Sequence, residues 1–214
     1  MTDTWADLTR FAIGLFALMN PFAALPYAFF AAGEQGKRGV LILAATSTAT
    51  MIFILLAMHI MGEAVLTMLG TSLASFQIGG GLVMFLGGLS MLSAPTTATP
   101  EGAADDSGGT GRLIKLGVAP LGIPMLAGAG AITKVIIETQ PHYGLEDGIL
   151  LGIVIVAVCL LCGAIVAASA VLMRILGPAF FSVLTRLSGL VIVAVAVEVM
   201  SMGVFAHVKA FTAG

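Results

Sequence analysis

Helix-breaking residues occur together at two places inside long apolar stretches of this sequence. The first is Asn20-Pro21, and the second begins at Pro120 and Pro124 and ends at Gly128-Ala129-Gly130-Ala131. Proline lacks a backbone donor and clashes with the preceding turn, and the residue before it avoids helical dihedral angles. An Asn followed by Pro also suits the N-cap and first position of a new helix. We therefore predict that a helix breaks and restarts at each place.

A restarted helix offers a particular kind of binding chemistry. Its N-terminus carries unpaired N–H groups and about half a positive charge, so it can hold a carboxylate without lysine or arginine. The sequence thus predicts a carboxylate-binding site made of Asn20, Pro21, Gly128, Ala129, Gly130 and Ala131. Simple helix kinks are the alternative, because neighbouring helices and water can satisfy the freed groups.

One ionisable residue, Glu198, lies near the centre of the last apolar stretch. A carboxyl group at such a depth is costly and is a functional candidate by default. Coupling to proton movement and a purely structural hydrogen bond are both open. Small residues in the third and sixth stretches are expected to let helices pack closely around the site; they are Gly79, Gly80, Gly81, Ser188 and Gly189.

Six apolar stretches must position these residues, and each is near the length of a bilayer crossing. They cover residues 8–30, 40–61, 73–93, 113–137, 148–172 and 187–206. The 214 residues are 59% hydrophobic and 9% charged, whereas a soluble domain is about 25% charged. This composition excludes a cytosolic enzyme, a secreted module and a disordered protein. The predicted fold class is an all-α membrane protein with six transmembrane helices.

The chain divides near its middle at residues 94–111, a Pro-, Thr-, Gly- and acid-rich segment without large apolar side chains. We predict a flexible linker there, between a three-helix repeat in 1–93 and a second in 112–214. A single offset brings the two helix breaks to matching depths. Three crossings per half would invert the second repeat, as in many secondary transporters, so both restarted helices would point their N-termini at the midplane. Chance similarity between glycine-rich stretches is the alternative.

Basic residues predict the orientation. They are more numerous beside the first, third and fifth connections (Lys37, Arg38, Arg112, Lys115, Arg174 and Arg186) than on the opposite side (Arg10, Lys134 and Lys209). Because basic residues favour the cytoplasmic side, we expect a cytoplasmic linker and two periplasmic termini.

No motif for catalysis or for a cofactor occurs in the chain, so we expect neither an enzyme nor a cofactor. Cys159 and Cys162 share one helix face in an apolar stretch and are expected to pack as small hydrophobic residues rather than bind metal. His59 and Glu63 are expected to be solvated rather than metal ligands. The nine basic residues form no patch for nucleic acid.

Four segments of the chain resemble the MarC family of bacterial inner-membrane proteins: LFALMNPFAALP, FQIGGGLVMFLGGLSML, APLGIPMLAGAGAI and RLSGLVIVAVAVEVM. The resemblance covers nearly the whole chain apart from the linker and termini. It implies six spanning helices and transport or export of small neutral amino acids such as threonine, alanine, serine and glycine, as in the SnatA-type transporters, which are grouped loosely with LysE-like exporters.

Two positions depart from the family pattern. The family commonly has Gly-Pro-Gly where this chain has Gly128-Ala129-Gly130, which weakens the expected second break. It tends to have Gln at the position of Glu198, and the change points to an altered coupling ion or substrate.

The expected function is therefore a secondary transporter, an exporter of small neutral amino acids across the bacterial inner membrane. The substrate carboxylate would meet the helix N-termini, and its ammonium would meet freed carbonyls, Asn20 or Glu198. Protons are the candidate coupling ion, and lipid surrounds the helices. A divalent-cation transporter of the LysE-like superfamily is one alternative, but it needs several carboxylates, and Glu198 stands alone at the midplane. A membrane protein that assembles with partners without transporting anything is the other.

Overall fold

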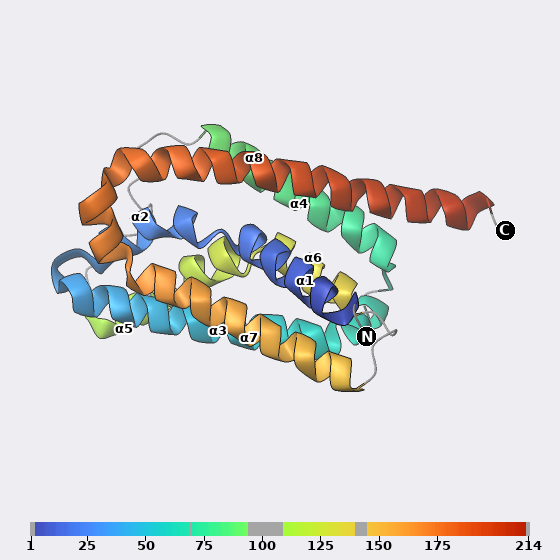
Figure 1. Cartoon of the computed structure of the whole chain (residues 1–214), viewed down its shortest axis with the longest axis horizontal. Coiled ribbons are helices and arrows are strands. Elements are labelled where there is room, and N and C mark those ends of the chain that lie inside the picture. The colour runs from blue at the N-terminus through green and yellow to red at the C-terminus, as the bar shows by residue number, and fades with distance from the viewer. Residues whose placement is uncertain (1–2, 69, 94–108, 140–144, 213–214) are drawn as a thin grey trace.

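The computed structural model describes residues 3–68, 70–93, 109–139 and 145–212, and these residues are helical with short turns and no strand (Figure 1). The predicted all-α class is confirmed. The elements are α1 (Asp3–Met19), α2 (Pro21–Ala32), the 3₁₀ turn η1 (Gly33–Gln35), α3 (Gly36–Met68), α4 (Leu73–Ser93), α5 (Thr110–Leu116), the π-helical η2 (Gly117–Leu126), α6 (Ala129–Glu138), α7 (Leu145–Ala167) and α8 (Ser169–Thr212).

Within the described ranges, five stretches are long and apolar enough to cross a membrane. They are Trp5–Ala32, Gly36–Gly62, Leu73–Leu92, Asp147–Ala167 and Ser182–Lys209. The predicted fourth stretch, 113–137, is not one helix, because it is divided among α5, η2 and α6. Ala119 and Ile123 interrupt it with extended dihedral angles. Each precedes a proline, whose ring disfavours helical geometry in the residue before it.

The predicted break at Asn20-Pro21 is confirmed. Asn20 has φ 42° and ψ 62°, and it is the one residue other than glycine with positive φ among those described. Asparagine tolerates this left-handed conformation better than most residues. The Asn20 N–H donates to the Phe16 carbonyl at 3.1 Å, but Pro21 has no N–H, so the Ala17 carbonyl loses its helical donor. The first apolar stretch is therefore two helices, α1 and α2.

The second predicted restart is also present. Gly128 is extended, with φ −76° and ψ 175°, and α6 begins directly after it. Figure 1 shows α6 beside α1 and running in the opposite direction. The Lys134 ammonium of α6 lies 5.7 Å from the ring centroid of Phe11 in α1, so the two helices are neighbours. Each of the two interrupted segments thus contributes one half-length helix to the same layer.

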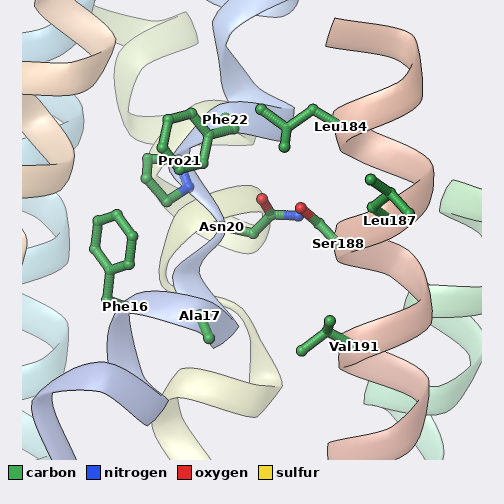
Figure 2. Close-up of a pocket in the computed structure, with 9 residues that line it drawn as sticks. All are labelled: Phe16, Ala17, Asn20, Pro21, Phe22, Leu184, Leu187, Ser188 and Val191. Atoms are coloured by element: carbon green, nitrogen blue, oxygen red, sulfur yellow. The ribbon is translucent and has the colours of Figure 1, made fainter. Parts of the chain in front are cut away.

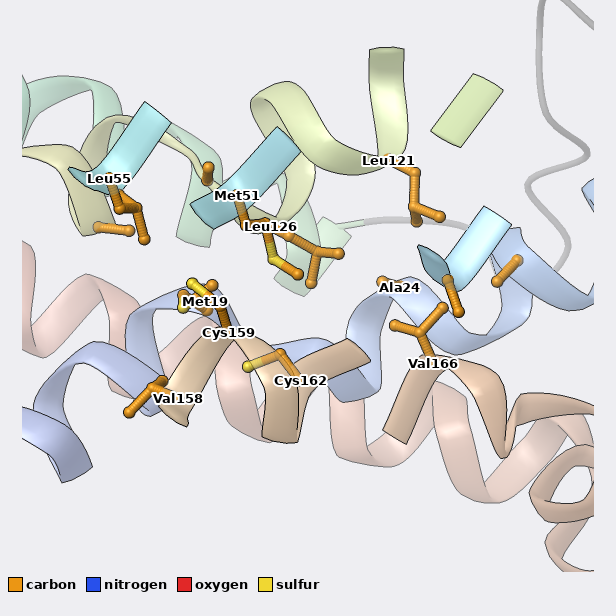
Figure 3. Packing of buried hydrophobic residues seen from close by; sticks show 14 of the residues in the cluster. Met19, Ala24, Met51, Leu55, Leu121, Leu126, Val158, Cys159, Cys162 and Val166 are labelled. Atoms are coloured by element: carbon orange, nitrogen blue, oxygen red, sulfur yellow. The ribbon is translucent and has the colours of Figure 1, made fainter. Parts of the chain in front are cut away.

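The largest apolar core joins α1, α2, α3, α5, η2, α6, α7 and the start of α8 (Figure 3). Met19, Met51 and Leu126 meet there beside Cys159 and Cys162, and both cysteines are free and fully buried. Their expected role as small hydrophobic residues is confirmed. This core holds the broken helix α1–α2 against α3 and α7, so the break lies in a well-packed part of the protein.

His59 ties the core together near one end of α3. Its Nδ1 lies 3.0 Å from the Thr139 hydroxyl at the end of α6, and its Nε2 lies 3.0 Å from the Gly148 carbonyl of α7. Both ring nitrogens are therefore hydrogen-bonded to protein groups, so the expectation that His59 is solvated is wrong.

The α4 and α8 helices form a second layer, in which they pack along each other. A Cβ on Gly81 would lie 3.1 Å from the Ala196 carbonyl, and one on Gly189 would lie 2.9 Å from the Gly88 carbonyl. Gly80 of α4 packs against Thr133 of α6. These glycines permit close approach, as expected, but Gly79 has nothing within 4 Å of its Cβ direction and makes no such contact.

The course of α8 differs from the predicted boundary of the last stretch. The helix begins at Ser169, bends sharply at Gly177 (φ 71°, ψ 163°) and then continues to Thr212.

Asp3 and Thr212, the described ends of the chain, lie at one end of the molecule in Figure 1. Most of the predicted linker, residues 94–108, lies outside the described residues.

Candidate functional site

A pocket of about 310 Å³ lies between the break in the first stretch and α8. Five of its lining residues come from α1, the break and α2, and four come from one face of α8 (Figure 2). They are Phe16, Ala17, Asn20, Pro21, Phe22, Leu184, Leu187, Ser188 and Val191. Asn20 lies close to the middle of the Trp5–Ala32 stretch, so the pocket lies deep within the protein's apolar belt.

Asn20 is the central residue of the pocket and is only 5% exposed. It occupies the N-cap position of α2, as predicted, but its side chain makes no capping hydrogen bond, which corrects the expectation that it serves as an ordinary cap. The reason is the left-handed backbone, since a capping residue normally has extended dihedral angles. Instead Nδ2 donates to the sulfur of Met91 at 3.8 Å, a weak acceptor.

Ser188 faces Asn20 from the other wall. In Figure 2 its hydroxyl and the Asn20 carboxamide point toward each other across the pocket. Neither the hydroxyl nor the Asn20 oxygen Oδ1 has a hydrogen-bond partner in the described part of the chain. Ser188 was expected only to help helix packing, and the structure places it on the wall of the pocket. The other seven lining residues are apolar, so these two side chains supply its side-chain polarity.

The break adds backbone polarity to the pocket. The last carbonyls of α1 form the negative end of one helix dipole, and the first turn of α2 forms the positive end of another. Both ends meet at Asn20, because the two helices are consecutive. The pocket therefore presents partial charges of both signs side by side, and none of its nine lining residues is charged.

The second break does not contribute to this pocket, which has no lining residue from 128–131. A Cβ on Gly130 would lie 3.0 Å from Met84 of α4, and Ala131 is buried in the large core. The helix α4 covers Gly130. In this structure the two breaks that the sequence grouped together are parts of two different packing environments.

Glu198 also lies outside the pocket. It is exposed on α8, and its carboxylate has no partner among the described residues, although its carbonyl accepts from the Ser201 hydroxyl at 2.7 Å. In this conformation it cannot contact a molecule bound at Asn20. Nor do three His, Cys, Asp or Glu side chains gather as a possible metal site anywhere in the described ranges.

Six lining residues were not predicted from the sequence, namely Phe16, Ala17, Phe22, Leu184, Leu187 and Val191. The four on α8 follow an i, i+3, i+4, i+7 spacing, which is one helix face. Extending that face from Ser188 would have identified them. The aromatic residues carry no such signal, because phenylalanines facing lipid and facing a pocket look alike in an apolar stretch.

Comparison with known proteins places these features in a family. The family described as "MarC family integral membrane protein" matches residues 5–208. The "UPF0056 membrane protein" of Aquifex aeolicus is 28% identical over 203 residues, which cover 92% of this chain and 94% of the relative. The "UPF0056 membrane protein YhcE" of Escherichia coli is 28% identical over 95% of this chain and 96% of its own. The "UPF0056 membrane protein MJ1677" of Methanocaldococcus jannaschii is 29% identical over 92% and 97%, respectively.

No solved structure matches the chain. The family match covers both layers of helices, the break at Asn20 and the pocket beside it. This multi-pass integral membrane protein belongs to the MarC family.

Proposed function

We propose that this protein is a secondary transporter that exports small neutral amino acids across the bacterial inner membrane, with the break at Asn20 as its substrate site. One observation carries the proposal. A nearly buried carboxamide with an unused oxygen lies where two helix ends of opposite polarity meet, in a pocket without charged side chains.

An amino acid zwitterion matches this arrangement. Its carboxylate would lie at the N-terminus of α2, where the Phe22 N–H and a partial positive charge favour an anion. Its ammonium would lie against the terminal carbonyls of α1, the Asn20 oxygen and the Ser188 hydroxyl. A ligand with a net charge is disfavoured, because burial of an uncompensated charge is costly.

The walls of the pocket support a small and neutral side chain. Phe16, Phe22, Leu184, Leu187 and Val191 offer no partner for a charged group. The volume of about 310 Å³ is at the lower limit of ordinary ligand pockets, which is about 300 Å³. Threonine, alanine, serine and glycine are the substrates that the resemblance to SnatA-type transporters implies, and they suit these walls.

The depth of the site supports transport rather than capture at a surface. Secondary transporters bind substrate near the bilayer midplane, at discontinuous helices of inverted repeats. Asn20 lies near the middle of its stretch, and the interrupted segments α1–α2 and η2–α6 lie in opposite directions (Figure 1). We propose that they belong to two inverted repeats, with the termini in the periplasm and the linker in the cytoplasm. Export is the direction that the resemblance implies.

The proposal is tested by reconstitution of the purified protein in proteoliposomes with a panel of labelled amino acids, with and without a pH gradient. We expect exchange of small neutral amino acids, little exchange of lysine or glutamate, and loss of exchange in Asn20→Ala. Ser201→Ala is the matched control, because Ser201 is exposed on α8 and bonds only within its helix. Exchange of no amino acid, or equal exchange in Asn20→Ala, would overturn the proposal.

A further inference from the structure

One charged residue of α1, Arg10, and one of α8, Glu198, point to a second functional feature. Ala17 and Val191 lie together at one end of the pocket, and Phe22 and Leu184 lie at the other, so the two helices run in opposite directions past it (Figure 2). Arg10 is seven residues before Ala17, and Glu198 is seven residues after Val191. Seven residues return a helix to within about 20° of the same face and advance it by about 10 Å. Arg10 and Glu198 therefore lie beyond the same end of the pocket, at the same level, on the two helix faces that line it.

The two side chains do not meet in this structure. Arg10 is 81% exposed and has only Asp7 of its own helix nearby, at 3.5 Å. Glu198 is exposed and has no side-chain partner among the described residues. Figure 1 shows α1 and α8 diverging toward the ends where the termini lie. Val191, at this end of the pocket, is 49% exposed, and Ile13, four residues before Ala17 and so near the same face of α1, is 65% exposed. The pocket is thus open toward the charged pair.

A carboxylate within an apolar span is costly when it has no partner, and Glu198 lies within Ser182–Lys209. Packed helices lie about 8–10 Å apart, which an arginine and a glutamate can bridge. Closure of α8 onto α1 would therefore pair two opposite charges, bury the exposed faces of Ile13 and Val191, and cover the pocket on this side.

We propose that α8 closes onto α1 as a gate on the side of the pocket where the termini lie, and that Arg10 and Glu198 form the ion pair that holds this gate closed. Such a gate would control access to the proposed transport site, so its purpose rests on the proposed function. The closure itself is testable without any substrate.

The direct test is disulfide cross-linking in native membranes. Arg10→Cys and Glu198→Cys are combined in a Cys159→Ala/Cys162→Ala background, since these are the two cysteines of the chain. The control pair replaces Glu198→Cys with Val197→Cys, because Val197 is also exposed but lies about 100° around α8. We expect an intramolecular disulfide in the first pair and its loss in the control. A disulfide between two copies of the chain, equal cross-linking in both pairs, or none in either while both thiols react with a maleimide would overturn the gate.

A second test keeps the native cysteines and uses transport. Arg10→Glu and Glu198→Arg are each expected to lower the transport rate by about tenfold or more, the scale of coupling between close charge pairs at an interface. The double exchange is expected to restore most of it. Failure of the double variant to recover, while both single variants lose transport, would contradict the pairing. Cross-linking without transport of any amino acid would leave the gate standing and refute the proposed function alone.

Discussion

Asn20 and Ser188 point toward each other across one pocket, although Asn20 lies in the first apolar span of the chain and Ser188 lies in the last. Asn20 comes from a break in one helix, and Ser188 comes from the regular face of another. The pocket therefore joins a backbone irregularity to the regular face of α8, the helix that we propose to close over it.

Replacement of Asn20 separates its backbone role from its side-chain role. Asn20→Gly should keep nearly the wild-type thermal unfolding temperature in detergent, because glycine adopts φ 42° without strain. Asn20→Val should lower stability by about 1–3 kcal/mol, since a β-branched residue is strained there. Both variants should lose amino acid exchange, because both lack the carboxamide. Full exchange in Asn20→Gly would show that the side chain does not contact substrate.

Water should reach Ser188 on the wall of the pocket, and bound substrate should cover it. In the Cys159→Ala/Cys162→Ala background, Ser188→Cys should react with a water-soluble maleimide, and a saturating neutral amino acid should slow the reaction. Ser72→Cys is the control, because Ser72 is exposed between α3 and α4, outside the pocket and the apolar spans; its labelling should not respond to the amino acid. Equal protection at both positions would indicate a global change rather than binding beside Ser188.

Two glycines of α4 should respond to alanine with opposite signs. Gly79→Ala should raise stability by about 0.5–1 kcal/mol, because alanine is the better helix former and nothing lies within 4 Å of the new methyl group. Gly81→Ala should lower stability by about 1–3 kcal/mol, since its methyl group would lie 3.1 Å from the Ala196 carbonyl of α8. Thermal unfolding in detergent measures both. A stabilised Gly81→Ala would show that the α4–α8 contact is looser than in this structure.

Labelling from the two sides of the membrane tests the proposed orientation. In whole cells, Thr212→Cys should react with a membrane-impermeant maleimide from outside, because we place the termini in the periplasm. Ser107→Cys, in the predicted linker, should react only after the membrane is permeabilised. The reverse pattern would invert the orientation but would leave the pocket unchanged.

The backbone irregularities were predictable from the sequence, because proline acts on its nearest neighbours. Asn20 precedes Pro21, Ala119 precedes Pro120 and Ile123 precedes Pro124, so a break at these three positions follows from a local steric rule. The rule does not apply at every proline, because α2 continues through Pro26. The sharp bend at Gly177 carries the same signal, because Gly177 precedes Pro178 and glycine adopts φ 71° without strain. No break was predicted there, because these residues lie between the predicted stretches 148–172 and 187–206.

The composition of the pocket could not be predicted in the same way. Whether Gly130 faces a cavity or Met84, and whether Glu198 faces the core or the outside, depends on how each helix is rotated about its axis. In a soluble helix the polar face reveals that rotation. In α4 and α8 nearly all residues are apolar on every side, so the information is absent until the helices are packed.

The most direct test of the central claim is competition for binding at the Asn20 break. Purified protein is incubated with one labelled neutral amino acid, such as threonine, and challenged with unlabelled threonine, its methyl ester, and the analogue in which a hydroxyl replaces the amino group. Because we place the carboxylate at the N-terminus of α2 and the ammonium at the end of α1, we predict that threonine alone displaces the label and that Asn20→Gly does not bind it. If the methyl ester and the hydroxy acid displace the labelled amino acid as effectively as threonine does, recognition of a zwitterion by the broken helix is contradicted.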